Sequence, residues 1–171
     1  MKVSDITREA TAAIVNAANG TLSGGGGVDG AIHRAGGPDI LEECREIRRT
    51  LYPEGLPAGE AVSTTAGLLP CRRVIHTVGP IWGREGGREA DLLAACYRNS
   101  LALALREGLE TVAFPSISTG AYGYPREAAA AVSSAAVAEF LRAERALREV
   151  RLVFFSRGDL EVFLGNHRLG A

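Results

Sequence analysis

The segment IVNAANGTLSGGGGVDGAIH, residues 14–33, decides the fold. It opens within a short apolar run, residues 12–15, which predicts a buried strand that stops at Asn16. Four consecutive glycines follow, and residues 28–35 beyond them predict a short helix. A buried strand that leads through a glycine-rich loop into a helix indicates an α/β protein.

Strand and helix patterns alternate along the rest of the chain. The expected strands are 60–65, 73–78, 111–114 and 150–155, and the expected helices are 38–49, 88–107, a long helix from Pro125, and 160–167. This alternation predicts an α/β sandwich with helices on both faces of the sheet. Because no linker, repeat or shift in composition divides the chain, we expect residues 1–171 to form one domain.

The composition limits the possible partners and surroundings. Of 171 residues, 46% are hydrophobic and 23% are charged, with a net charge of −1, which argues against a large basic surface for duplex nucleic acid. No apolar run approaches the ~18 residues of a membrane span, and the first ten residues contain no apolar signal region. The three cysteines are scattered, which favours buried thiols in a reducing compartment. We therefore expect a cytoplasmic protein with no membrane and no duplex nucleic acid partner.

Two glycine-rich loops follow expected strands and lead into expected helices. The first covers residues 16–27 and the second covers residues 116–124. In open α/β sheets, ligands bind beyond the carboxyl ends of the strands. A glycine loop at a helix start offers free N–H groups, a positive dipole end and close access to the backbone. Glycines also serve plain tight turns, but four in a row before a helix favour an anion site, and two such loops suit a pyrophosphate.

Other motifs that bind nucleotides or metals fail in this sequence. Residues 25–30, GGGVDG, match G-x-G-x-x-G, but residues 16–24 separate them from the strand. The region near Thr50, where a Rossmann site needs an acidic residue at a strand end, has the pattern of a helix end and a loop. No G-K-[ST], H-E-x-x-H, G-x-S-x-G or metal-ligand Cys/His spacing occurs. We therefore expect no metal and no cofactor, and we expect His76 to be a core residue of a strand.

Polar residues around the first glycine loop form a candidate site. Asp29 and His33 are four residues apart and share one face of the expected helix, and the helix dipole stabilises a carboxylate in its first turn. Asn16 and Asn19 follow the expected strand. Each residue has an ordinary structural role as well, as a helix-start carboxylate or a turn asparagine. Their convergence on the glycine run favours a functional site.

Four long motifs, in order, give the chain a family resemblance. Residues 14–19, 24–33, 74–80 (VIHTVGP) and 113–125 (AFPSISTGAYGYP) resemble macrodomains of the MacroD type. The resemblance implies a three-layer α/β/α sandwich around a mixed β-sheet that binds ADP-ribose. It also implies hydrolysis of mono-ADP-ribose from acidic side chains of ADP-ribosylated proteins, and deacetylation of O-acetyl-ADP-ribose; with no metal-ligand pattern in the sequence, we expect both reactions to be metal-independent.

The resemblance also implies roles for single residues. Asn19 and Asp29 would line the distal ribose, His33 matches a position implicated in activity, and the expected catalytic residues are Asn19, Asp29 and His33. The expected ligand-binding residues are Asp5 and Ile6 at the adenine, Asn16, Gly24, Gly25, Gly26, Gly27 and Val28 in the first loop, Ser118, Thr119, Gly120, Ala121 and Tyr122 in the second, and Phe155 beside the adenine. The family's G-D-I-T begins here with Ser4, and only three residues precede it, so we expect a shortened sheet edge.

Two other functions fit the same loops. A non-catalytic reader of ADP-ribosylated proteins or poly(ADP-ribose) needs the loops but no acid. An enzyme that processes RNA or nucleotide phosphates would use the same anion site, but the near-neutral charge and the lack of basic stripes count against RNA.

Overall fold

The computed structural model describes residues 1–170, which form six strands and five α-helices. The strands are β1 (Lys2–Val3), β2 (Ala13–Ala18), β3 (Ala61–Thr65), β4 (Arg73–Val78), β5 (Thr111–Phe114) and β6 (Glu149–Phe154). The helices are α1 (Gly27–Gly36), α2 (Pro38–Thr50), α3 (Glu89–Arg106), α4 (Arg126–Ala143) and α5 (Arg157–Asn166), and a 3-10 turn, η1, covers Ile6–Arg8.

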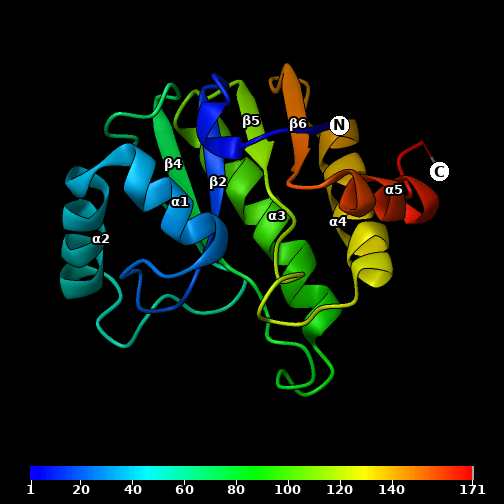
Figure 1. The fold of residues 1–171 in the computed structure, drawn as a ribbon, viewed down its shortest axis with the longest axis horizontal. Helices are drawn as coiled ribbons and strands as arrows, with labels where there is room; N and C mark the ends of the chain where they lie inside the picture. The colour runs from blue at the N-terminus through cyan, green and yellow to red at the C-terminus, as the bar shows by residue number, and fades with distance from the viewer. Residues whose placement is uncertain (171) are drawn as a thin grey trace.

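The strands form one mixed sheet in the order β1-β6-β5-β2-β4-β3. Only β3 and β4 are antiparallel; the other neighbouring pairs among the described residues are parallel. In Figure 1 α2 lies at one end of the molecule and α5 at the other. Core clusters lie on both faces of the sheet, which confirms the expected three-layer α/β/α sandwich around a mixed sheet.

Successive residues of the central strand β2 face opposite core layers, as the two-residue period of a strand requires. Ile14 packs in the cluster that holds Ile32 of α1 and Ile40 of α2. Val15 packs in the cluster that holds Leu93 of α3 and Val137 of α4. The sheet therefore separates a layer of α1 and α2 from a layer of α3, α4 and α5.

The strand before the glycine run is longer than predicted. β2 continues through Asn16 to Ala18, because its backbone pairs with β4 as far as Val78. The prediction that this strand stops at Asn16 is wrong, since an asparagine side chain that finds partners inside the protein does not interrupt a backbone ladder. Consequently Asn16 lies inside the sheet, and of the two asparagines only Asn19 lies in the loop.

Differences at the chain ends have local causes. The last helix begins at Arg157 and not at 160, because Ser156 caps it by accepting a hydrogen bond from the Asp159 N–H at 3.1 Å. The short elements β1 and η1 were not predicted, since two or three residues show no periodicity. β1, at the edge of the sheet, spans two residues.

The parallel strands end at one edge of the sheet, and the loops that follow them lie along it. Figure 1 shows the loops after β2 and β5 below the strand ends, on the lower side of the view. Because β2 and β5 are paired neighbours, the two glycine-rich loops lie next to each other. In residues 1–170, no helix has the length and apolar character that crossing a bilayer requires.

Candidate active site

The two glycine-rich loops end at helices whose first turns carry no side-chain cap. Gly26 is the N-cap of α1 and Pro125 is the N-cap of α4, and neither helix receives a capping hydrogen bond from a side chain. The first N–H groups of a helix have no partner within the helix. Two uncapped helix starts on neighbouring loops therefore present N–H donors and positive dipole ends to the same edge of the sheet.

The first glycine loop is closely packed on one side and open on the other. A Cβ at Gly30 of α1 would lie 2.3 Å from the Gly25 carbonyl oxygen, so only a glycine lets the helix approach the loop. A Cβ at Gly26 would meet no atom within 4 Å, and the Gly26 backbone is extended, with φ −93° and ψ −172°. The loop backbone at Gly26 is thus accessible to a ligand.

The second loop has a strained residue at its start. Ser118 has a φ of 65°, the left-handed region that L residues rarely adopt. The loop is closed by Tyr124 N–H, which donates to the Ser118 carbonyl at 2.9 Å, and by Trp82 N–H, which donates to the Tyr122 carbonyl at 2.9 Å. Backbone strain of this kind persists where the surroundings enforce it, and it clusters at ligand sites. Gly120 and Ala121 at the tip are exposed, Thr119 and Tyr122 are half-buried, and Ser118 is buried.

Asp29 is a buried carboxylate whose two oxygens face different directions. Oδ1 accepts a hydrogen bond from Asn16 Nδ2 at 2.8 Å and lies 3.3 Å from His33 Nε2, which confirms that Asp29 and His33 share a helix face. A Cβ at Gly25 would lie 3.3 Å from Oδ2 and 3.6 Å from Asn19 Nδ2. Oδ2 and the Asn19 amide therefore both face the glycine loop, while Oδ1 is held by Asn16 and His33.

Asn19 is fixed by its own loop. Its Nδ2 donates to the Gly24 carbonyl at 3.1 Å, and its Oδ1 accepts from Thr21 Oγ1 at 2.7 Å. Gly24 in turn lies over the His33 ring, since a Cβ there would be 3.6 Å from the His33 Cδ2 atom. The structure therefore brings Asn19, Asp29 and His33 together beneath the glycine loop, with Val28 half-buried at the start of the same helix.

Asn16 lies behind this group and has no exposed surface. It was predicted among the ligand-binding residues, but its side chain is inside the sheet, with Nδ2 bonded to Asp29 and to His76. It therefore supports the Asp29 carboxylate and does not line the surface. The sequence pattern ended the strand at Asn16 and so assigned Asn16 to the loop, whereas the strand continues to Ala18.

Asp5 and Phe155 follow the paired strands β1 and β6, at the β1 end of the sheet. Ser4 N–H donates to the Phe154 carbonyl at 3.0 Å, so the pairing of the parallel strands β1 and β6 extends to the residues directly before Asp5 and Phe155. Phe155 is 92% exposed and Phe154 is 4% exposed, so only one of the two faces the core. Asp5 caps η1 by accepting from Thr7, and these hydrogen bonds hold the pKa of its carboxyl below the usual range.

Ile6, predicted beside Asp5 at the ligand, is a core residue. It packs in the layer of α1 and α2, where η1 contacts α1. Its surface toward a ligand is therefore small, and it supports the position of Asp5.

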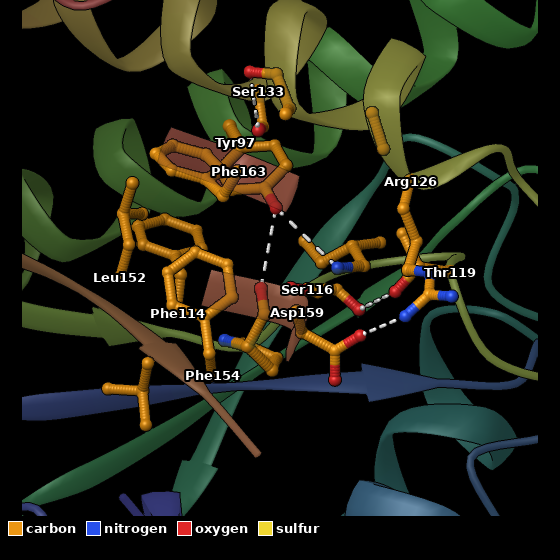
Figure 2. Close-up of a pocket in the computed structure, with 15 residues that line it drawn as sticks. Tyr97, Phe114, Ser116, Thr119, Arg126, Ser133, Leu152, Phe154, Asp159 and Phe163 are labelled. Atoms are coloured by element: carbon orange, nitrogen blue, oxygen red, sulfur yellow. Dashed lines mark hydrogen bonds and ion pairs between the residues drawn. The ribbon is translucent and has the colours of Figure 1, made fainter. Parts of the chain in front are cut away.

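A pocket lies behind the second loop, between β5, β6 and the helices α3, α4 and α5 (Figure 2). Within it the Tyr97 hydroxyl donates to the Pro115 carbonyl at 3.3 Å and accepts from the Ile117 N–H at 3.5 Å. Arg126 Nη1 forms an ion pair with Asp159 Oδ1 at 2.6 Å. The lining of the pocket includes none of Asn19, Asp29 and His33. We infer that the Tyr97 hydroxyl supports the backbone of the second loop at Pro115 and Ile117.

Three side chains near Asp29 have atoms that can coordinate metals. Potential ligand atoms of His33, Cys44 and His76 all lie within 4.8 Å of one another, from three elements that no sequence spacing connects. Burial raises the pKa of the Cys44 thiol to about 12 and lowers the pKa of His76 to about 3. Both ring nitrogens of His76 already have partners, Asn16 and Thr64. A neutral thiol and an engaged imidazole favour a hydrogen-bonded core here, because metals take thiolates and free nitrogens.

Comparison with known proteins assigns a family. The family model described as Macro domain matches residues 15–133. A Macro domain-containing protein of Streptomyces nogalater is 55% identical over 93% of this chain and 86% of its own length. A protein of Citrobacter rodentium named O-acetyl-ADP-ribose deacetylase is 53% identical over 93% of this chain and 89% of its own.

Solved structures agree with this result. The Oceanobacillus iheyensis macrodomain with ADP has a TM-score of 0.93 and 48% identity, covering 96% of this chain and 86% of that one. The Trypanosoma brucei macrodomain in complex with ADP-ribose has a TM-score of 0.85 and 39% identity, covering 94% of this chain and 65% of that one. The sheet, the two glycine loops and these similarities together show that the chain belongs to the Macro domain family.

Proposed function

We propose that this chain is an ADP-ribose-binding hydrolase. It removes mono-ADP-ribose from aspartate and glutamate side chains of ADP-ribosylated proteins, and it deacetylates O-acetyl-ADP-ribose, in both cases without a metal. The observation that carries the proposal is the buried Asp29, whose Oδ2 faces the open glycine loop beside the Asn19 amide. The relatives support it: one is named O-acetyl-ADP-ribose deacetylase, and two solved macrodomains hold ADP or ADP-ribose.

The order of the strands fits an extended dinucleotide-like ligand. The adenine would lie between Asp5 and Phe155 beside β1 and β6, and the pyrophosphate would lie on the uncapped helix starts at Gly26 and Pro125. The distal ribose would then lie over Asp29, beyond β2. The path from β1 to β2 crosses three strand spacings, about 14 Å at the usual separation of neighbouring strands.

Both proposed reactions add water to an ester of a ribose hydroxyl and release a carboxylic acid. Asp29 Oδ2 would hold and orient the water, and Asn19 would fix the ribose. We assign much of the rate to positioning of water and substrate, with help from the substrate's own phosphates.

The alternative is a non-catalytic reader of ADP-ribose groups. A reader needs the two loops and the adenine contacts, which both functions share. It does not need a buried carboxylate, which is costly to desolvate and is here held by Asn16 and His33. The enzyme is therefore the better explanation of Asp29.

A release assay tests the proposed function. We expect the protein to release ADP-ribose from glutamate-linked mono-ADP-ribosylated protein and to free acetate from O-acetyl-ADP-ribose, because both substrates are esters. Serine-linked ADP-ribose, an acetal without an acyl group, should stay attached. The measurement is single-turnover release with equal substrate loading. Binding of all three substrates with no release from any of them would identify a reader instead.

Chelation tests the metal-free part of the proposal. Hydrolysis should persist within about twofold after dialysis against EDTA, because the hydrogen-bonded His76 and the neutral Cys44 thiol disfavour metal coordination. Activity before and after EDTA, and after adding back Zn²⁺ or Mg²⁺, is the measurement. A loss that one particular divalent ion restores would show that the cluster of His33, Cys44 and His76 holds a metal.

A further inference from the structure

A chain of buried hydrogen bonds leads from Asp29 into the sheet. Asn16 Nδ2 lies 2.8 Å from Asp29 Oδ1 and 3.0 Å from His76 Nδ1. On the other side of the ring, His76 Nε2 lies 2.8 Å from Thr64 Oγ1, which is 3.0 Å from the Thr65 carbonyl oxygen. Asn16, His76 and Thr64 have no exposed surface. They lie on the neighbouring strands β2, β4 and β3, and Asn16 and His76 are direct register partners.

The partners at each end fix where every hydrogen lies. The two hydrogens of the Asn16 amide go to the Asp29 carboxylate and to His76 Nδ1, so Nδ1 is unprotonated. The neutral ring then carries its hydrogen on Nε2 and donates it to Thr64 Oγ1, and the Thr64 hydroxyl donates to the Thr65 carbonyl. From Asn16 to the Thr65 carbonyl, each group therefore donates to the next one, and His76 Nε2 also lies 3.8 Å from the Cys44 sulfur.

This arrangement prevents the Asn16 amide from turning over. A rotated amide would place Oδ1 against the Asp29 carboxylate, and that contact would be repulsive; it would also require His76 to carry its hydrogen on Nδ1 instead of Nε2. In the observed orientation Asn16 Oδ1 is buried and finds no hydrogen-bond partner within residues 1–170. A buried acceptor without a partner costs stability, and natural proteins contain few of them. This cost in stability accompanies the orientation in which both Asn16 amide hydrogens are donated, one to Asp29 and one to His76.

We propose that His76, itself oriented by Thr64, is a positioning residue that locks the Asn16 amide and through it the Asp29 carboxylate. The inference rests on the proposed function and deepens it. With Oδ1 held by Asn16, Oδ2 of Asp29 is the oxygen that faces the glycine loop and Asn19. His76 itself touches no substrate. Its role is to fix which carboxylate oxygen acts and in which direction it points.

The first test replaces His76 in two ways. His76→Asn keeps an acceptor near the Nδ1 position, whereas His76→Phe removes it. We expect His76→Phe to lower the single-turnover rate at saturating substrate about tenfold, less than the ~100-fold that a 1 Å misplacement of reacting groups can cost. His76→Asn should restore most of the rate. ADP-ribose affinity, measured by calorimetry, should change less than twofold in both variants, because Asp29 contributes little to binding.

A matched pair of threonine variants keeps the test valid if His76→Phe does not fold. Thr64 and Thr77 are both fully buried on adjacent strands, and each hydroxyl makes a hydrogen bond, Thr77 to the Glu60 carbonyl at 2.7 Å. Thr64→Val should slow hydrolysis severalfold, since His76 loses its acceptor. Thr77→Val removes an equivalent bond that does not lead to Asp29, and its rate should equal that of the parent. Equal rates for Thr64→Val and Thr77→Val would overturn the proposal.

Two further measurements separate this inference from the proposed function. In an Asp29→Ala background, Thr64→Val should cause no additional loss, because its effect passes through Asp29; an additive loss overturns the inference. Nitrogen NMR of His76 should show a neutral ring protonated at Nε2, and a proton on Nδ1 overturns it without any reference to activity. A parent protein that hydrolyses none of the esters refutes the proposed function itself, and the positioning role with it.

Discussion

Gly26→Glu is expected to abolish ADP-ribose binding and leave the fold intact. The Gly26 backbone is extended and a Cβ there meets no atom within 4 Å, so a glutamate side chain fits without strain. Its carboxylate would, however, lie where we place the pyrophosphate, at the uncapped start of α1. Two like charges about 4 Å apart near a protein surface repel by about 4 kcal/mol, which corresponds to roughly a thousandfold loss of affinity.

Calorimetry with free ADP-ribose measures this loss, and two variants control for it. Gly165 in α5 is also exposed, and a Cβ there would likewise meet no atom within 4 Å. Gly165→Glu therefore adds the same group far from the loops and should bind like the parent. Gly26→Gln adds the bulk without the charge and should lose less affinity than Gly26→Glu. If Gly26→Glu binds ADP-ribose as tightly as the parent, the glycine run forms a turn and no anion site.

Local patterns predicted the strands well where both faces of the strand are buried. The ranges 73–78 and 111–114 match β4 and β5 residue for residue, because a continuous run of β-branched and apolar residues at the centre of a sheet has few alternatives. At Asn16 the same approach failed. Its polar side chain suggested the end of a strand, and only the partners supplied by β4 and α1 make a buried asparagine acceptable there.

The candidate site was predicted in part for the same reason. Asp29 and His33 come from one helix, so their spacing alone places them on one face. The support beneath Asp29 comes from Asn16, His76 and Thr64, which lie on three strands and are separated by 12 to 60 residues in sequence. No spacing rule connects them, and His76 was predicted only as a core residue. It is a core residue, but one whose two ring nitrogens both have polar partners.

Asp29→Ala is expected to lose most hydrolysis and to retain ADP-ribose binding. A positioned acid–base group typically contributes ~10²–10⁴-fold in rate, which equals about 3–5 kcal/mol of transition-state stabilisation. Binding should depend mainly on the adenine contacts, the two loops and the ribose, and removal of one carboxylate also relieves repulsion with the phosphates. The measurement is single-turnover release of ADP-ribose from a glutamate-modified protein, beside calorimetry with free ADP-ribose.

Two controls decide what a loss in Asp29→Ala means. Asp39 is an exposed carboxylate in the first turn of α2, one position nearer the helix start than Asp29 in α1, so Asp39→Ala should behave like the parent. Asp29→Asn keeps an oxygen that can accept from Asn16 while removing the charge; a loss as large as in Asp29→Ala assigns the effect to the charge and not to the support. Hydrolysis by Asp29→Ala within a few-fold of the parent would reduce Asp29 to a helix-start residue. Loss of both binding and activity would show that Asp29 supports the structure of the glycine loop. The reader function would then explain the site better, because Asp29 would have no catalytic role separable from ligand binding.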